Sequence, residues 1–159
     1  MDRLSQILWR ERELLELLSY KLEVERVLLA SGRTRWLNQA TREIEDVLST
    51  MRESELMRSV AADAAAEELG LAANPSLGAL AEAAPEPWRV ILLEHRDALI
   101  GLAREIAELS EENKDLLSAG YRAAQETLLA MGGGITEGYT PTGTAVVGGA
   151  RTRLVDRAL

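Results

Sequence analysis

The sequence lacks cysteine and phenylalanine, has a single histidine, His95, and is only 4% aromatic over 159 residues. The absence of cysteine excludes disulfides and thiolate metal sites. A Ser–His–Asp triad would depend on that one histidine. A di-iron helical bundle needs a glutamate three residues before its histidine, and that position is Leu92. The missing residue types therefore argue against an enzyme, and no cofactor is expected.

The sequence also lacks an excess of positive charge and a long apolar run. Its net charge is -8, and an acidic chain is a poor partner for nucleic acid, whose affinity comes from Lys and Arg on phosphates. No uncharged stretch approaches the roughly 18 apolar residues of a membrane span, so no membrane insertion is expected. The start, Met1-Asp2-Arg3-Leu4, does not resemble a signal peptide. We therefore expect a cytoplasmic protein.

Apolar residues, which make up 47% of the chain, recur at helical spacing. A first helix is predicted over residues 2–30, with Asp2 as its N-cap. Its leucines are spaced by threes, fours and sevens: Leu4, Leu8, Leu15, Leu18, Leu22 and Leu29. Gly32 suits the left-handed position that ends a helix, and Thr34 is expected to cap the next one. So short a connection makes the next helix antiparallel to the first.

The second helix is predicted over residues 34–69 and is rich in alanine toward its end. Those alanines either allow close helix packing or leave a thin, weak seam, and the sequence does not separate the two. Residues 70–86 contain Asn74-Pro75, Gly78 and Pro85, so they are predicted to form a linker. Within it, a short helical turn fits residues 77–84.

A third helix is predicted over residues 87–131, with Pro87 in its first turn. Its apolar residues keep a seven-residue repeat in two series: Leu92, Leu99 and Ile106, then Leu102, Leu109, Leu116 and Ala123. The predicted fold is all-α: an elongated antiparallel coiled-coil hairpin with a third long helix beside it. We expect one domain over residues 1–131 and a flexible Gly/Thr-rich tail over 132–159.

A second apolar set on the third helix lies off this repeat, at Leu117, Tyr121, Leu128 and Leu129. It is either a docking surface for a partner's amphipathic helix or core against the first two helices. Asn113, at a position of the repeat where an apolar residue is expected, either fixes helix register or hydrogen-bonds a partner. The candidate partner-binding residues are Asn113, Leu116, Leu117, Tyr121, Leu128, Leu129 and Tyr139.

Several segments together resemble the FlgN family of flagellar export chaperones. They include the turn Leu28-Leu29-Ala30-Ser31-Gly32 followed by Trp36-Leu37, and the start of the second helix at Thr41-Arg42-Glu43-Ile44-Glu45. Next come the Pro-bearing linker, the segment Glu111-Glu112-Asn113-Lys114-Asp115-Leu116-Leu117, and a tail with Tyr139 and Gly143. The resemblance spans residues 4 to 143.

The resemblance implies a cytoplasmic chaperone for hook-associated proteins, which form the junction between hook and filament. Such a chaperone binds their C-terminal helical segments, prevents premature assembly and delivers them to the type III export apparatus. The tail is then expected to bind the client or, through Val146, Val147, Leu154 and Val155, to fold back onto the client surface. The alternative is a generic coiled-coil scaffold or homo-oligomer, and a homodimer fits either function.

Overall fold

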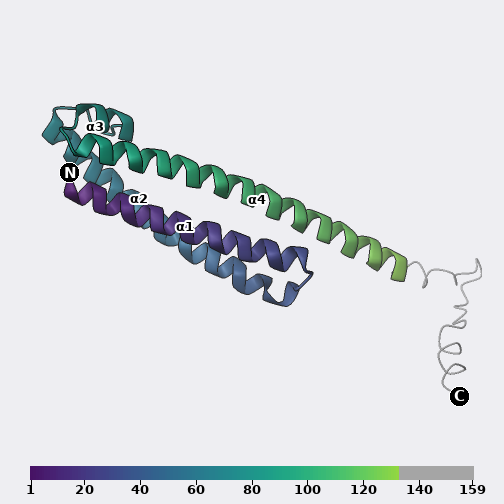
Figure 1. Cartoon of the computed structure of the whole chain (residues 1–159). Coiled ribbons are helices and arrows are strands. Elements are labelled where there is room, and N and C mark those ends of the chain that lie inside the picture. Colours follow the sequence, from purple (N-terminus) through teal and green to yellow (C-terminus); the bar gives the residue numbers. More distant parts are fainter. Residues whose placement is uncertain (133–159) are drawn as a thin grey trace, which may run out of the picture. The chain divides into compact units, whose positions relative to one another are not determined.

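The structure, a computed structural model, describes residues 1–132, and within them it is all-α, as predicted. The elements are α1 (Asp2–Ala30), the 3-10 turn η1 (Thr34–Trp36), α2 (Leu37–Leu69), α3 (Leu77–Ala83) and α4 (Trp88–Gly132), shown in Figure 1. In this described part, no helix is both long enough and apolar enough to span a bilayer. The predictions for residues 133–159, including Tyr139 and the self-docking tail, lie outside the described residues.

The chain divides into two compact units after Leu117. The first, Met1–Leu117, holds α1, α2, α3 and the beginning of α4. The described part of the second is the remainder of α4, from Ser118. The packing and the core described next belong to the first unit.

α1 and α2 form the predicted antiparallel hairpin, closed at Gly32 with a φ of +67°. The N–H of Arg33 donates to the carbonyl of Leu28 at 3.1 Å, so the closing turn satisfies a carbonyl at the end of α1. The prediction that Thr34 caps α2 is wrong. Thr34 instead begins η1, where no side chain caps, and the N–H of Trp36 donates to the carbonyl of Arg33.

The start of α1 also differs from the prediction. Asp2 is the first residue of the helix and not its cap, a position that Met1 occupies without a side-chain hydrogen bond. Asp2 therefore acts through its charge, which is favourable in the first turn because the N-terminal end of a helix is partly positive.

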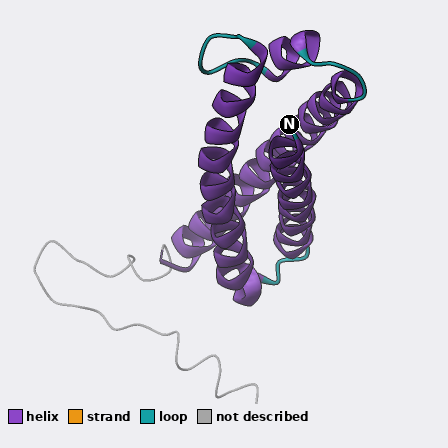
Figure 2. Cartoon of the chain, turned by 90° about the vertical axis from the view of Figure 1, so that its left-hand side faces the viewer, coloured by secondary structure: helices purple, strands orange, loops and turns teal. Residues whose placement is uncertain are grey.

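The segment between α2 and α4 contains the short helix that fitted residues 77–84. α2 ends at Gly70, whose φ is +70°. Ser76 then caps α3, its hydroxyl accepting from the N–H of Ala79 at 3.1 Å. α4 begins at Trp88, and the carbonyl of Pro87 accepts from the N–H of Ile91. Figure 2 shows α3 and its loops joining the end of α2 to the start of α4.

The alanine-rich end of α2 is part of the core. It packs against leucines of α1, α3 and α4 in a cluster made of Leu4, Leu8, Ala61, Ala62, Ala65, Ala66, Leu80, Ala81, Ala84 and Leu92. Because the methyl side chain of alanine is small, other helices can approach α2 closely at these positions, and three of them pack against it there. The close-packing interpretation of the alanines is the one that the structure bears out.

A second cluster lies nearer the hairpin turn and joins three helices, α1, α2 and α4. Its buried members are Leu18, Leu22, Ile44, Val47 and Leu109. α4 runs in the same direction as α1, since Ser5 contacts His95, Ser19 contacts Glu105 and Arg26 contacts Glu112. α1 therefore packs against α2 on one side and against the first part of α4 on another.

Candidate functional site

The predicted repeat on α4 is used for packing against the hairpin. Its positions from Leu92 to Leu109 are buried or half-buried, and they include His95, which is buried between α4 and α1. These positions are therefore not available to a partner protein.

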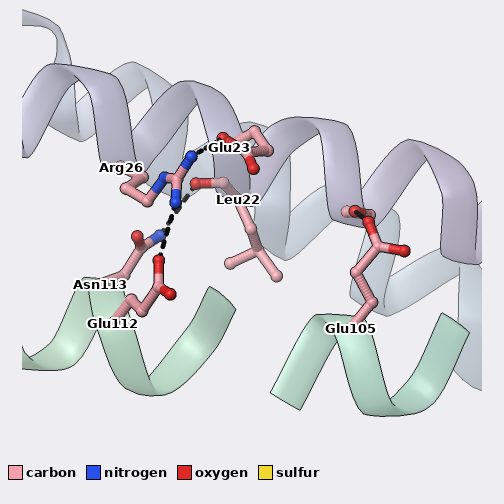
Figure 3. A network of polar contacts seen from close by, with 7 residues as sticks. Leu22, Glu23, Arg26, Glu105, Glu112 and Asn113 are labelled. Carbon is pink, nitrogen blue, oxygen red and sulfur yellow. Dashed lines mark hydrogen bonds and ion pairs between the residues drawn. The ribbon is translucent and has the colours of Figure 1, made fainter. Parts of the chain in front are cut away.

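Asn113 ends the packed stretch. Its side-chain Nδ2 donates to the carbonyl oxygen of Leu22 at 3.0 Å and to a carboxylate oxygen of Glu25, also at 3.0 Å. Figure 3 shows the amide pointing at α1. Because both donor contacts are internal and the residue is only 5% exposed, the register-fixing role of Asn113 has direct geometric support.

Two further polar contacts tie α4 to α1 near Asn113. The Arg26 guanidinium joins Glu112 at 2.8 Å, and the same guanidinium joins Glu23, as Figure 3 shows. The Ser19 hydroxyl donates to Glu105 at 2.6 Å. Solvent screens polar contacts at such a partly exposed seam, so these contacts set the register of α4 on α1 more than they stabilise it.

Immediately after Asn113, a cleft opens between α4 and the hairpin within the first unit. Its volume is about 460 Å³. Leu22, Leu29, Leu37 and Leu117 supply its apolar lining. Leu117 is 59% exposed, while its neighbour Leu116 is half-buried. The structure thus brings Leu117 together with hairpin leucines that sequence analysis had not selected, although Leu29 and Leu37 flank the predicted turn.

The second unit presents the rest of the predicted set on one stretch of helix. Tyr121, Leu128 and Leu129 are 65%, 69% and 74% exposed. Tyr121, Ala124, Leu128 and Met131 are spaced by three, four and three residues, so they share one helix face. The tyrosine hydroxyl accepts from the Gln125 amide at 3.1 Å. Sequence analysis selected Tyr121 and Leu128 of this stripe but not Ala124 or Met131, and the selected Leu129 lies beside the stripe.

The spacing of the packed repeat would continue at Gly120, Ala123 and Thr127, whose side chains are small or polar. The apolar residues restart one position later, about 100° further around the helix axis. A helix that faced one partner along its whole length would not change its apolar face. The apolar residues after Leu117 therefore do not continue the repeat that packs on the hairpin.

His95 is the single titratable group buried deeply between α1 and α4 in the described chain. Its ring meets Trp9 edge-on at 5.0 Å between centroids, and Ser5 Oγ lies 3.4 Å from Nε2. Its Nδ1 is buried with no partner. Burial lowers the pKa of His95 below its ordinary value, the Arg12 charge lowers it further, and Glu94 opposes the shift. This histidine therefore packs as a neutral side chain.

We expect the unfolding free energy to fall as the pH drops below the ordinary histidine pKa of about 6.5. Between that value and the lower pKa of the folded state, the unfolded chain binds more protons, so stability decreases with acid. The slope from one group cannot exceed about 1.4 kcal/mol per pH unit. Urea titrations of the wild type and of His95→Phe at several pH values between about 7 and about 5 measure it.

Subtracting the stability curve of His95→Phe from that of the wild type removes the contribution of the other titrating groups to the pH dependence. Glu11 is one of these, because burial raises its pKa against the opposing charge of Arg58, and it therefore favours the folded state as acid is added. If wild type and His95→Phe follow parallel curves, His95 is not the neutral buried group described above.

A family model described as FlgN protein matches residues 1–146. The chain belongs to the FlgN family. FlgN proteins are flagellar export chaperones, so the resemblance noted from the sequence is confirmed over nearly the whole chain. Comparisons with curated proteins and with solved structures each gave no match.

Within this FlgN chain, the candidate residues fall into three groups. Asn113 donates to α1, and Leu116 is half-buried beside it. Leu117, Tyr121, Leu128 and Leu129 expose most of their side chains. Tyr139 lies outside the described residues. The exposed group is the one that remains free for a partner among the described residues.

Proposed function

We propose that this chain is a cytoplasmic chaperone that binds the C-terminal helical segments of hook-associated flagellar proteins, its clients. It holds them unassembled and delivers them to the type III export apparatus. The family supplies the flagellar export role. The observation that supports helix binding is the exposed apolar stripe of α4, which carries Tyr121, Leu128 and Met131, with the exposed Leu129 beside it.

The chemistry of that stripe suits an amphipathic helix. Apolar side chains spaced by threes and fours match the spacing on a partner helix, so two such faces interdigitate. Fully burying a leucine-sized side chain contributes roughly 1.5–3 kcal/mol. Three anchors thus supply about 5–9 kcal/mol before the costs of association and ordering are subtracted. The expected complex is therefore reversible, as a chaperone that must release its client requires.

The cleft beside Leu117 provides a second set of apolar contacts. Its lining mixes leucines with Glu25, Asn38 and Thr41. A client helix end, which carries free backbone groups, needs such polar partners next to apolar ones. We therefore propose this cleft as a contact for the end of a client helix, considered independently of the stripe.

Calorimetry with purified C-terminal segments of the hook-associated proteins of the same organism tests the proposal. We expect a defined complex with a Kd in the range of roughly 0.1–10 μM, to which the three anchors contribute part of the free energy and the remaining contacts of the client segment the rest. A folded helical protein that binds none of the segments, and that self-associates in light scattering, would instead establish the scaffold alternative. The same stripe would then serve contacts between copies of the chain.

A further inference from the structure

The turn of the α1–α2 hairpin carries positive charge in an acidic protein. From Arg26 to Arg42 the sequence has four arginines and no acidic residue, whereas the chain as a whole has a net charge of -8. Arg33 and Arg35 lie at the turn itself and are exposed. We call Gly32–Trp36 the hairpin tip.

The acidic residues closest in sequence to the hairpin tip form ion pairs or hydrogen bonds with other side chains. Glu23 pairs with Arg26, and Glu43 pairs with Lys21 at 2.6 Å. Glu25 accepts from Thr41 and Asn113. No salt bridge among the described residues engages Arg33 or Arg35. Their two charges therefore face solvent without a counter-charge from the fold.

Trp36 adds a large apolar surface to the hairpin tip. Its side chain is 51% exposed, and the Arg35 guanidinium lies 4.8 Å from the ring centroid. The tip surrounds a shallow hollow of about 320 Å³ lined by Gly32, Arg33, Thr34, Arg35 and Trp36. Tryptophan and arginine are the residues most enriched at the energetic centres of protein interfaces, and here they occur together on a short turn.

We propose that the hairpin tip docks onto an acidic protein surface, with Trp36 in an apolar socket and Arg33 and Arg35 on surrounding carboxylates. This inference rests on the proposed function, because we assign the acidic surface to a cytosolic component of the export apparatus that receives the loaded chaperone. The hairpin tip and the stripe of α4 share no residue, so the two proposals assign the client and the export component to different residues.

Charge magnitudes favour a protein over a membrane as the occupant. Binding to anionic lipid gains about 1 kcal/mol per basic residue and needs clusters of roughly four to eight of them. The tip offers two arginines, and the remainder of the chain is acidic, so a bilayer would repel more charge than it attracts. A protein socket instead gains about 2 kcal/mol or more from one buried tryptophan.

The test measures binding of the full chain to the purified cytosolic components of the export apparatus by biolayer interferometry. The variants are Arg33→Glu with Arg35→Glu, and separately Trp36→Ala. We expect one component to bind the wild type and each variant to weaken that binding roughly tenfold or more. Binding should also weaken as salt rises from about 50 mM to about 300 mM, because exposed charges are screened.

The matched control is Arg52→Glu with Arg89→Glu, which changes the net charge equally at two exposed arginines of α2 and α4 that no described salt bridge engages. It should bind like the wild type. Circular dichroism and client calorimetry are run on every variant, so loss of folding or of client binding is detected separately. Binding that is unchanged in the tip variants, or absent for every component, overturns the proposal. Tip-dependent flotation with vesicles of about 30% anionic lipid, without protein binding, would assign the tip to membranes instead.

Discussion

Replacing Leu128 with aspartate is expected to weaken client binding by roughly 30- to 1,000-fold while leaving the helical content unchanged. The side chain is 69% exposed in the free protein, so its loss removes little from the core. In the complex it would be buried against the client helix, and an unpaired carboxylate there costs about 2–4 kcal/mol. Calorimetry with the client segment measures the affinity, and far-ultraviolet circular dichroism measures the helical content.

Ala119→Asp is the matched control for this substitution. Ala119 is exposed on the same helix and lies nine residues before Leu128, which places it on the opposite side of the helix. The control adds the same charge without touching the stripe, so its affinity should stay within about threefold of the wild type. Equal weakening by both variants would mean that net charge, not the stripe, governs binding. Unfolding of the Leu128 variant would place that residue in a core.

The helices could be predicted from the sequence because their limits depend on local chemistry. Gly32 and Gly70 adopt the positive φ that ends α1 and α2, and both positions follow from the low cost of that conformation for glycine. The leucine spacing fixed the faces of α1 and of the first part of α4. The start of α2 was missed because Thr34 enters a 3-10 turn, whose backbone bonds make a side-chain cap unnecessary.

The candidate site was only partly predictable, because an exposed and a buried side chain can share one sequence pattern. Asn113 and Leu117 were both plausible partner contacts, but only the fold shows that the amide of Asn113 is bonded to α1. The hairpin side of the cleft, at Leu29 and Leu37, depends on which helix lies across the turn. Whether the arginines of the hairpin tip are paired likewise depends on which carboxylates form ion pairs with the other basic side chains.

The change of apolar face along α4 would separate stability from the proposed client binding. Residues that pack on the hairpin precede Leu117, whereas Tyr121, Leu128 and Leu129 follow it. A chaperone gains from this separation, because its binding surface is already exposed and no part of its core has to be uncovered when the client binds. The same arrangement predicts that substitutions in the two parts of one helix affect different measurements.

Leu92→Ala is therefore expected to lower the unfolding free energy by about 2–5 kcal/mol without changing the affinity of the folded protein for its client. Leu92 is 1% exposed and packs with Leu4, Leu8 and Leu80, so its truncation opens a cavity where α1, α3 and α4 meet. For a domain of this size, the loss corresponds to a fall in Tm of roughly 6–20 °C. Urea and thermal unfolding measure the stability, and client calorimetry at low temperature measures the affinity of the molecules that remain folded.

Leu56→Ala provides the comparison, since it makes the same truncation on α2 at a side chain that is 70% exposed. It should change stability by about 0.5 kcal/mol or less. A similar loss in both variants would mean that α4 is not anchored through Leu92. A loss of client affinity in Leu92→Ala, measured where the protein is fully folded, would mean that the packed and exposed stripes of α4 are coupled, and the division of this helix into a structural and a client-binding part would have to be abandoned.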